Sequence, residues 1–218
     1  FDDDARLISR ELEIALTSRE MGRGQRIPLA GFPYHALDGY LARLIKKGYR
    51  VAICEQIGDT SSKGIVERQV VRVVTPGTLM ETSLLDQSAN NYLAAVVLQG
   101  DEAGLAYVDI TTSEFATTQV SIDDLPLELD RLGASEVLLP RGNSLPSSLS
   151  VSLVTPLEDE ELRPAEAEQA LKEHFGVATL EAYGCEGMPL AIGAAAAILA
   201  YLSKTQKLVL ERLQGLHT

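Results

Sequence analysis

Basic side chains in the first third of this chain are suited to one kind of chemistry, the binding of phosphate. Arg68 and Arg72 are four residues apart in a β-branched segment, and the alternation of side chains along a strand predicts that both point to one face. The basic residues considered together are Arg19, Arg23, Arg26, Lys63, Arg68 and Arg72. As a set they predict a surface that meets the backbone of a nucleic acid, and the alternative is that they are ordinary solvated arginines and lysines.

The distribution of charge along the sequence separates two parts. The whole chain has a formal net charge of -12, which by itself argues against a nucleic-acid partner. Residues 1–85 contain 12 Lys+Arg and 11 Asp+Glu, whereas residues 86–218 contain 7 and 20, so the two parts carry +1 and -13. Within residues 5–80 there are 12 basic and 7 acidic groups. We therefore expect the first part to approach phosphate and the second part to contact proteins and other domains.

Two carboxylates on one turn raise a second possibility, the metal-dependent cleavage of nucleic acid. Asp109 and Glu114 flank a short turn, and metal nucleases gather several carboxylates to hold two ions about 4 Å apart. A third and a fourth carboxylate on neighbouring strands are not evident. The pattern therefore favours two solvated acidic residues and leaves a nuclease as the alternative.

Other kinds of site find little support in the sequence. No segment has the Gly-x-x-x-x-Gly-Lys-Ser/Thr pattern of a P-loop, so we expect no ATP site of that kind, no enzyme and no cofactor in these 218 residues. Cys54 and Cys185 have neither metal-ligand nor disulfide spacing, which favours no metal site and a reducing compartment, the cytoplasm. The apolar residues 188–202 number 15, fewer than the roughly 20 that cross a bilayer, so we expect no membrane contact.

Residues 28–59 contain the strongest local pattern, a helix followed at once by a strand. The apolar residues of the helix recur with the helical period and form one stripe. They are Leu37, Tyr40, Leu41, Leu44 and Ile45. Gly48 follows two lysines and predicts a left-handed end to the helix. Residues 51–54 are almost continuously apolar, which predicts a strand covered on both faces.

The segments on either side complete a small mixed α/β unit. A helix is predicted after the acidic residues at positions 2–4, because negative charge in a first turn favours the positive end of the helix dipole. Strands are predicted at residues 13–17 and 67–75. Residues 79–91 contain few apolar side chains in their later part and are typical of an interdomain linker, so we place the boundary near Leu85.

The second part begins with strands and continues with alternating helices and strands. Short turns between residues 92–98, 105–110 and 114–120 predict an antiparallel meander. The later elements are expected as a helix at 122–132, strands at 136–139 and 151–154, and helices at 164–175 and 191–202. This succession predicts an α/β fold of the ribonuclease-H-like type, although the hydrophobic pattern alone would allow another α/β sandwich.

Two ordered blocks resemble a known family. The segment PLAGFPYHALDGYLARLIKKGYRVAICEQIGD, which begins at Pro28, and VERQVVRVVTPGTL at residues 66–79 resemble the mismatch-recognition domain of MutS-type DNA mismatch repair proteins. The later segments LAAVV, GLAYVDITTSEF and AAILAYLSKTQK are similar to the connector domain of that family. The resemblance implies an N-terminally truncated recognition domain of mixed α/β structure over residues 1–84 and a ribonuclease-H-like connector domain over residues 85–218.

The resemblance also implies a function and a set of contacts. Members of the family recognise mispaired or unpaired bases in duplex DNA, and Leu29 and His35 lie where the family places residues against DNA. Arg68 aligns with a basic residue that reaches the duplex. The Phe-x-Glu motif, whose Phe is inserted beside the mismatched base, should lie just upstream of Phe1 and does not occur in this chain. Without that wedge, selectivity for mismatches should suffer.

The implied partners belong to the parent protein. The connector domain is expected to link recognition to the clamp, to the ATPase and to a MutL-type protein, and the parent is expected to be a homo-oligomer that uses ATP and Mg. Two other functions stay open at this point. One is a ribonuclease-H-like metal-dependent nuclease, and the other is a protein-docking module without DNA binding.

Overall fold

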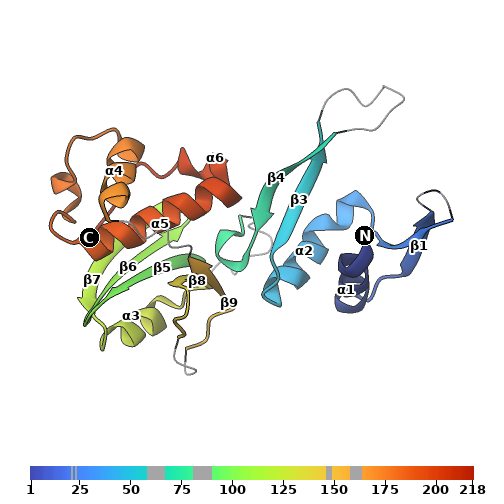
Figure 1. The fold of residues 1–218 in the computed structure, drawn as a ribbon, viewed down its shortest axis with the longest axis horizontal. Helices are drawn as coiled ribbons and strands as arrows, with labels where there is room; N and C mark the ends of the chain where they lie inside the picture. Colours follow the sequence, from blue (N-terminus) through green and yellow to red (C-terminus); the bar gives the residue numbers. More distant parts are fainter. Residues whose placement is uncertain (21, 23, 58–66, 81–89, 146–148, 158–163) are drawn as a thin grey trace.

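The computed structural model describes residues 1–20, 22, 24–57, 67–80, 90–145, 149–157 and 164–218. The described chain forms two lobes, a first lobe of residues 1–80 and a second lobe of residues 90–218 (Figure 1). This division agrees with the predicted two-domain α/β organisation. The predicted basic residues Arg23 and Lys63, and the boundary near Leu85, lie outside the described residues.

The first lobe consists of two hairpins and two helices. Its elements, in order, are α1 (Asp2–Leu12), β1 (Leu16–Glu20), β2 (Arg26–Ala30), the 3-10 turn η1 (Tyr34–Ala36), α2 (Leu37–Lys46), β3 (Val51–Gln56), β4 (Arg68–Val74) and the 3-10 turn η2 (Pro76–Thr78). β1 pairs with β2, and β3 pairs with β4, both antiparallel. We call the pair β3–β4 the ribbon. In Figure 1 the ribbon and the β1–β2 hairpin both extend away from the sheet of the second lobe.

The helices of the first lobe follow the predicted patterns. The apolar stripe of α2 buries Leu41, Leu44 and Ile45, and Gly48 follows with a left-handed φ of 80°. The strand predicted at residues 13–17 is wrong at its start, because Glu13 ends α1 with a left-handed φ of 58° and the strand begins three residues later, at Leu16. A residue in that conformation cannot continue an extended strand.

Two basic side chains, one in α2 and one directly after its last residue, hold α1. The Arg43 guanidinium donates to the carbonyl of Leu12 at 3.1 Å, and the Lys47 ammonium donates to the carbonyl of Glu11 at 3.2 Å and to its carboxylate at 2.9 Å. These cations satisfy carbonyls that the end of a helix leaves unpaired. The hydrogen bond from Lys47, and next that from Arg10, holds the pKa of Glu11 below its ordinary value. These two cations are therefore engaged inside the lobe.

The prediction that residues 51–54 form a strand covered on both faces is wrong. Val51 and Ile53 are half-buried, whereas Ala52 and Cys54 are exposed. Val51 and Ile53 pack on the small core formed by Leu41, Ile45, Val74 and Leu79. In the described part of the chain the other face of the ribbon has no covering helix, so an apolar run that predicts a central strand forms one with a single covered face.

The second lobe has one five-stranded sheet. Its elements are β5 (Tyr92–Gln99), β6 (Glu102–Asp109), β7 (Glu114–Ser121), α3 (Leu125–Leu132), β8 (Glu136–Pro140), β9 (Leu153–Leu157), α4 (Pro164–Phe175), the 3-10 turn η4 (Glu181–Tyr183), α5 (Pro189–Thr205) and α6 (Lys207–Leu210). The strand order is β7-β6-β5-β8-β9, with β8 and β9 parallel to β5 and the meander antiparallel. The meander and the alternating helices and strands after it agree with the predicted succession of elements and with the α/β class. The helix α3 and the strand β9 begin three and two residues later than predicted.

Helices cover both faces of this sheet. The helix α5 lies across one face with α4 packed against it, and α3 covers part of the other face (Figure 1). The larger core, between the sheet and α5, includes Val108, Phe115, Ile198 and Leu202. α5 approaches the sheet so closely at Gly104 that an added Cβ would lie 2.0 Å from the carbonyl oxygen of Leu190. None of the helices within the described residues is both long enough and apolar enough to span a membrane.

Candidate nucleic-acid interface

The three residues predicted to meet DNA come from three elements of the first lobe. Leu29 lies in β2 and is half-buried, His35 lies in η1 and is exposed, and Arg68 is the exposed first residue of β4. Among the described residues, no hydrogen bond, ion pair or ring contact joins any two of these three side chains. They are therefore separate surface positions and do not form one cluster of interacting groups.

The prediction that Arg68 and Arg72 share one face is wrong. Arg72 pairs with Ile53 on β3, whereas Arg68 pairs with Gln56. Those partners are three residues apart, an odd number that puts the two arginines on opposite faces of the ribbon. The cause is a β-bulge, because Val71 is an extra residue in β4 that has no partner in the register. Arg68 is accordingly exposed and Arg72 is half-buried.

The other hairpin places a basic residue beside one of the predicted contacts. In the β1–β2 register Thr17 pairs with Leu29 and Arg19 pairs with Ile27, so Arg19 and Leu29 lie on the same face of the hairpin. Arg26 is opposite Glu20 on the other face. A phosphate approaching the first face would therefore meet Arg19 without a carboxylate directly opposite it.

Tyr34, an exposed aromatic residue next to His35, was not among the contacts predicted from the sequence. Tyr34 is 85% exposed and begins η1, while Phe32 just before it stacks on Tyr40 of α2 with ring centroids 4.5 Å apart. This ring contact fixes the segment and leaves Tyr34 free to meet a partner. The signal was present in the sequence, because Tyr34 is an aromatic residue that falls outside the apolar stripe of the helix.

The carboxylates considered for a nuclease are used to build a turn. Asp109 is 1% exposed, and its carboxylate accepts hydrogen bonds from the backbone N–H groups of Asn91 at 3.1 Å and Thr111 at 2.8 Å, and from the Thr111 hydroxyl at 2.6 Å. The carboxylate of Glu114 accepts from the Tyr92 hydroxyl at 2.9 Å. Within the described ranges, no group of three or more His, Cys, Asp or Glu residues could hold a metal ion. The geometry gives a nuclease no support.

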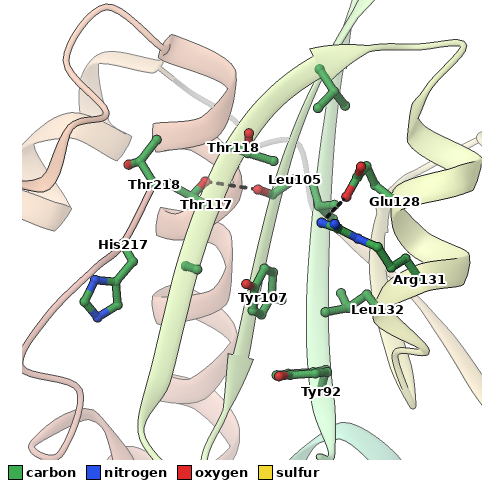
Figure 2. A pocket seen from close by; sticks show the side chains of 12 residues that line it. Tyr92, Leu105, Tyr107, Thr117, Thr118, Glu128, Arg131, Leu132, His217 and Thr218 are labelled. Atoms are coloured by element: carbon green, nitrogen blue, oxygen red, sulfur yellow. Dashed lines mark hydrogen bonds and ion pairs between the residues drawn. The ribbon is translucent and has the colours of Figure 1, made fainter.

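A hollow of about 500 Å³ lies on the sheet of the second lobe beside α3 (Figure 2). The rings of Tyr92 and Tyr107 meet edge to face there, with centroids 5.1 Å apart. The guanidinium of Arg131 is bound to the Glu128 carboxylate at 2.7 Å. Burial is the main cause that raises the pKa of both tyrosines above the ordinary value. A paired arginine in an acidic lobe offers little to a polyanion, so we do not place the nucleic-acid interface here.

The strand that carries Arg68 is fixed at its other end to the second lobe. Residues 75–78 follow β4 directly, and we call them the junction turn. Each member of the junction turn has a hydrogen bond to the second lobe. The carboxylate of Glu136 accepts from the Thr75 hydroxyl and from the Gly77 N–H, the Asn91 amide donates to the Pro76 carbonyl at 2.8 Å, and the Gln206 amide donates to the Thr78 carbonyl.

Glu136 is fully buried, and each oxygen of its carboxylate accepts hydrogen bonds from a different lobe. Its Oε2 receives the hydrogen bonds from the junction turn. Its Oε1 accepts from the Thr155 hydroxyl at 2.7 Å and from the Tyr201 hydroxyl at 2.8 Å, both in the second lobe. All four donors are neutral, and together they give each oxygen of this buried carboxylate two hydrogen bonds.

The Tyr201 hydroxyl makes folding sensitive to alkaline pH. Its burial, and next the negative charge of Glu136, raise the pKa of Tyr201 far above the ordinary value of 10.0. The folded chain therefore keeps this proton where the unfolded chain loses it, so the stabilisation is complete below about pH 10 and is lost as pH rises further. We expect the unfolding constant to increase about tenfold per pH unit above 10 from this group.

Urea unfolding of the wild type and of Tyr201→Phe at several pH values between 8 and 11.5 measures this effect. The variant should be less stable at pH 8, because Glu136 loses a donor, and its stability should fall less steeply above pH 10. Parallel curves for the two proteins would show that Tyr201 is not the responsible group.

The comparisons with known proteins match both lobes. The family model described as MutS domain I matches residues 1–83, and the model described as MutS domain II matches residues 91–214. The chain is 50% identical over 220 residues to the DNA mismatch repair protein MutS of Dehalococcoides mccartyi, an alignment that covers 99% of the chain and 25% of the relative.

More distant relatives carry the same name. The identity is 46% over 228 residues with the MutS protein of Symbiobacterium thermophilum and 45% over 240 residues with that of Methanosarcina acetivorans. These alignments cover 99% and 100% of the chain and 26% and 27% of the relatives. The chain therefore spans about a quarter of the length of the curated relatives it matches.

Proposed function

Because the chain belongs to the MutS family of DNA mismatch repair proteins, we propose that its first lobe is the part of a mismatch repair protein that meets duplex DNA with mispaired or unpaired bases. The observation that carries the proposal is Arg68, an exposed cation at the start of β4 with no ion pair among the described residues. The recognition domain is proposed to cover residues 1–84 and the connector domain residues 85–218.

The contacts that we propose are Leu29, His35 and Arg68. Arg68 would meet a phosphate or a groove edge, which positions the duplex but does not by itself read its sequence. The excess of basic over acidic groups, 12 against 7 in residues 5–80, supports the approach of DNA to this lobe. Tyr34 is a further candidate, because an exposed ring next to His35 could stack on a base or a sugar.

The second lobe is proposed to dock proteins. Residues 86–218 carry a net charge of -13, which repels a polyanion but is compatible with a protein surface. The partners proposed are the remaining domains of the parent protein and a MutL-type protein. The parent is further proposed to be a cytoplasmic homo-oligomer that uses ATP and Mg.

Arg68→Ala should weaken the binding of duplex DNA. Loss of one charge-assisted contact to phosphate should reduce affinity about five- to tenfold at low salt, to matched and mismatched duplexes alike. Fluorescence anisotropy with a labelled duplex measures it. Arg131→Ala is the matched control, since it removes the same charge from a side chain that is paired with Glu128 in the second lobe.

The comparison of the two variants locates the interface. Equal losses for Arg68→Ala and Arg131→Ala would mean that only the total charge matters, and the proposed interface would be wrong. If the wild-type chain bound no duplex at low salt, the alternative of a protein-docking module without DNA binding would replace it.

A further inference from the structure

We infer that Glu136 is a positioning residue, whose carboxylate fixes the direction of the β3–β4 ribbon and thereby the place of Arg68 relative to the second lobe. The inference rests on the proposed contact between Arg68 and DNA. Glu136 lies at the start of β8 and is 0% exposed, so it cannot touch DNA itself. It acts through the junction turn, because its Oε2 accepts hydrogen bonds from Thr75 and Gly77 of that turn.

Close packing leaves the junction turn little room to move relative to the second lobe. Gly77 lies directly against the second lobe, where an added Cβ would be 2.8 Å from the Cβ of Glu136 and 3.0 Å from the Cβ of Leu93. Thr75 is 0% exposed, and its N–H donates to the Thr78 hydroxyl at 3.0 Å, which closes the turn on itself. A turn that is rigid, buried and bonded at every residue can hold the strand that enters it in one direction.

The length of β4 converts a small tilt into a large displacement. The strand has 7 residues, and at about 3.3 Å per residue it spans roughly 23 Å. A tilt of about 10° at the junction turn would then move Arg68 by roughly 4 Å, more than the length of a hydrogen bond. Gly77 is also buried, so without Glu136 its backbone N–H would lose its hydrogen-bond acceptor, which would favour a rearrangement of the turn.

Two substitutions of Glu136 should differ in their effect, because four groups donate hydrogen bonds to its carboxylate. The Gly77 N–H can only donate, so in Glu136→Gln the amide oxygen should face the junction turn, and the amide N–H groups should face the hydroxyls of Thr155 and Tyr201, which can accept. Glu136→Gln should therefore preserve the position of the ribbon. Glu136→Met fills a similar volume and accepts none of the four bonds.

A matched pair of threonine variants separates positioning from general stability. Thr75→Val and Thr155→Val each remove one hydroxyl from Glu136, and both side chains are buried, at 0% and 5% exposed. The first change removes one of the two hydrogen bonds that Glu136 accepts from the junction turn, and Thr78 also loses a partner. The second change leaves both of those hydrogen bonds in place. Only Thr75→Val should displace the ribbon.

The experiment measures a distance and an affinity in the whole chain. Spin labels on the exposed Cys54 of β3 and on Leu127→Cys of α3, which is 67% exposed, report the position of the ribbon relative to the second lobe, while Cys185 is buried. In Glu136→Met and Thr75→Val we expect the distance distribution to shift or broaden by about 3 Å, and in Glu136→Gln and Thr155→Val to match the wild type. Circular dichroism and thermal unfolding confirm that each variant is folded.

Affinity for a labelled matched duplex gives the second readout. A tilted ribbon would also hold Arg68 at a different distance from Leu29 and His35, the other proposed contacts, which lie outside the ribbon. Glu136→Met should therefore bind about three- to tenfold more weakly, and should cause no further loss in the Arg68→Ala background. A wild-type distance distribution in Glu136→Met, equal changes in the two threonine variants, or an undiminished loss in the Arg68→Ala background would overturn the inference. The label distances decide whether Glu136 holds the ribbon even if the wild-type chain binds no DNA, so failure of the proposed function remains distinguishable.

Discussion

Gly104→Ala should cost the chain most of its stability, through the addition of a single methyl group. The added Cβ would lie 2.0 Å from the Leu190 carbonyl oxygen, 2.1 Å from its carbon and 2.7 Å from the Ala191 nitrogen. All three are backbone atoms at the start of α5, which cannot move aside as a flexible side chain would. The helix and the strand would have to separate, so we expect a loss of about 3 kcal/mol or more, or failure to fold.

Urea unfolding followed by circular dichroism measures the loss. Gly39→Ala is the matched control, because Gly39 is exposed in α2, has no atom within 4 Å of an added Cβ, and should gain about 0.5 to 1 kcal/mol of helix stability. If Gly104→Ala were as stable as the wild type, the close packing of α5 on β6 would be refuted.

Gly77→Ala should be the second most damaging substitution, and its effect should appear at the junction between the lobes. The added Cβ would meet the Cβ atoms of Glu136 and Leu93, at 2.8 and 3.0 Å, and both belong to side chains that are themselves buried. Overpacking of this kind costs typically about 1 to 3 kcal/mol. Displacement of the turn should also stretch the hydrogen bond from the Gly77 N–H to Glu136, which is already 3.2 Å.

Two measurements follow the junction in Gly77→Ala. Its urea midpoint should fall, and limited proteolysis should release a fragment of the second lobe sooner than from the wild type, because loosened lobes open locally more often. Proteolysis of Gly39→Ala at the wild-type rate would show that a methyl group in the first lobe is harmless by itself. Wild-type stability and proteolysis of Gly77→Ala would mean that the turn is not held against Glu136 as described.

Patterns of short range were enough to predict much of the fold. The stripe from Leu37 to Ile45 predicted α2, and the three turn-separated strands predicted the meander of the second lobe, because helical and strand periods are properties of neighbouring residues. The left-handed conformation of Gly48 also follows from local sequence. The α/β class of the second lobe could be predicted because three turn-separated strands followed by alternating helices and strands leave few ways to arrange them.

Features that depend on distant partners were not predictable. The bulge at Val71 turns Arg72 away from the face of Arg68, and only the pairing of β3 with β4 shows it. In the sequence Glu136 is an ordinary polar residue at the predicted start of a strand, but in the structure it is buried. The four groups that donate hydrogen bonds to it are 61, 59, 19 and 65 residues away in the sequence. Periodicity carries no information about such pairs. The DNA contacts Leu29, His35 and Arg68 remain predictions from the family resemblance.

The most direct test of the central claim, that the first lobe binds duplex DNA through charge without reading a mismatch, is a titration of one matched and one G·T duplex with the wild-type chain at two salt concentrations. The family resemblance places the ring that reads a mismatch in a Phe-x-Glu segment, and no such segment occurs in the 218 residues. We expect equal dissociation constants for the two duplexes, of about 10⁻⁴ to 10⁻⁶ M, which weaken steeply as salt rises. Clearly tighter binding of the G·T duplex, or an affinity that does not change with salt, would contradict the account.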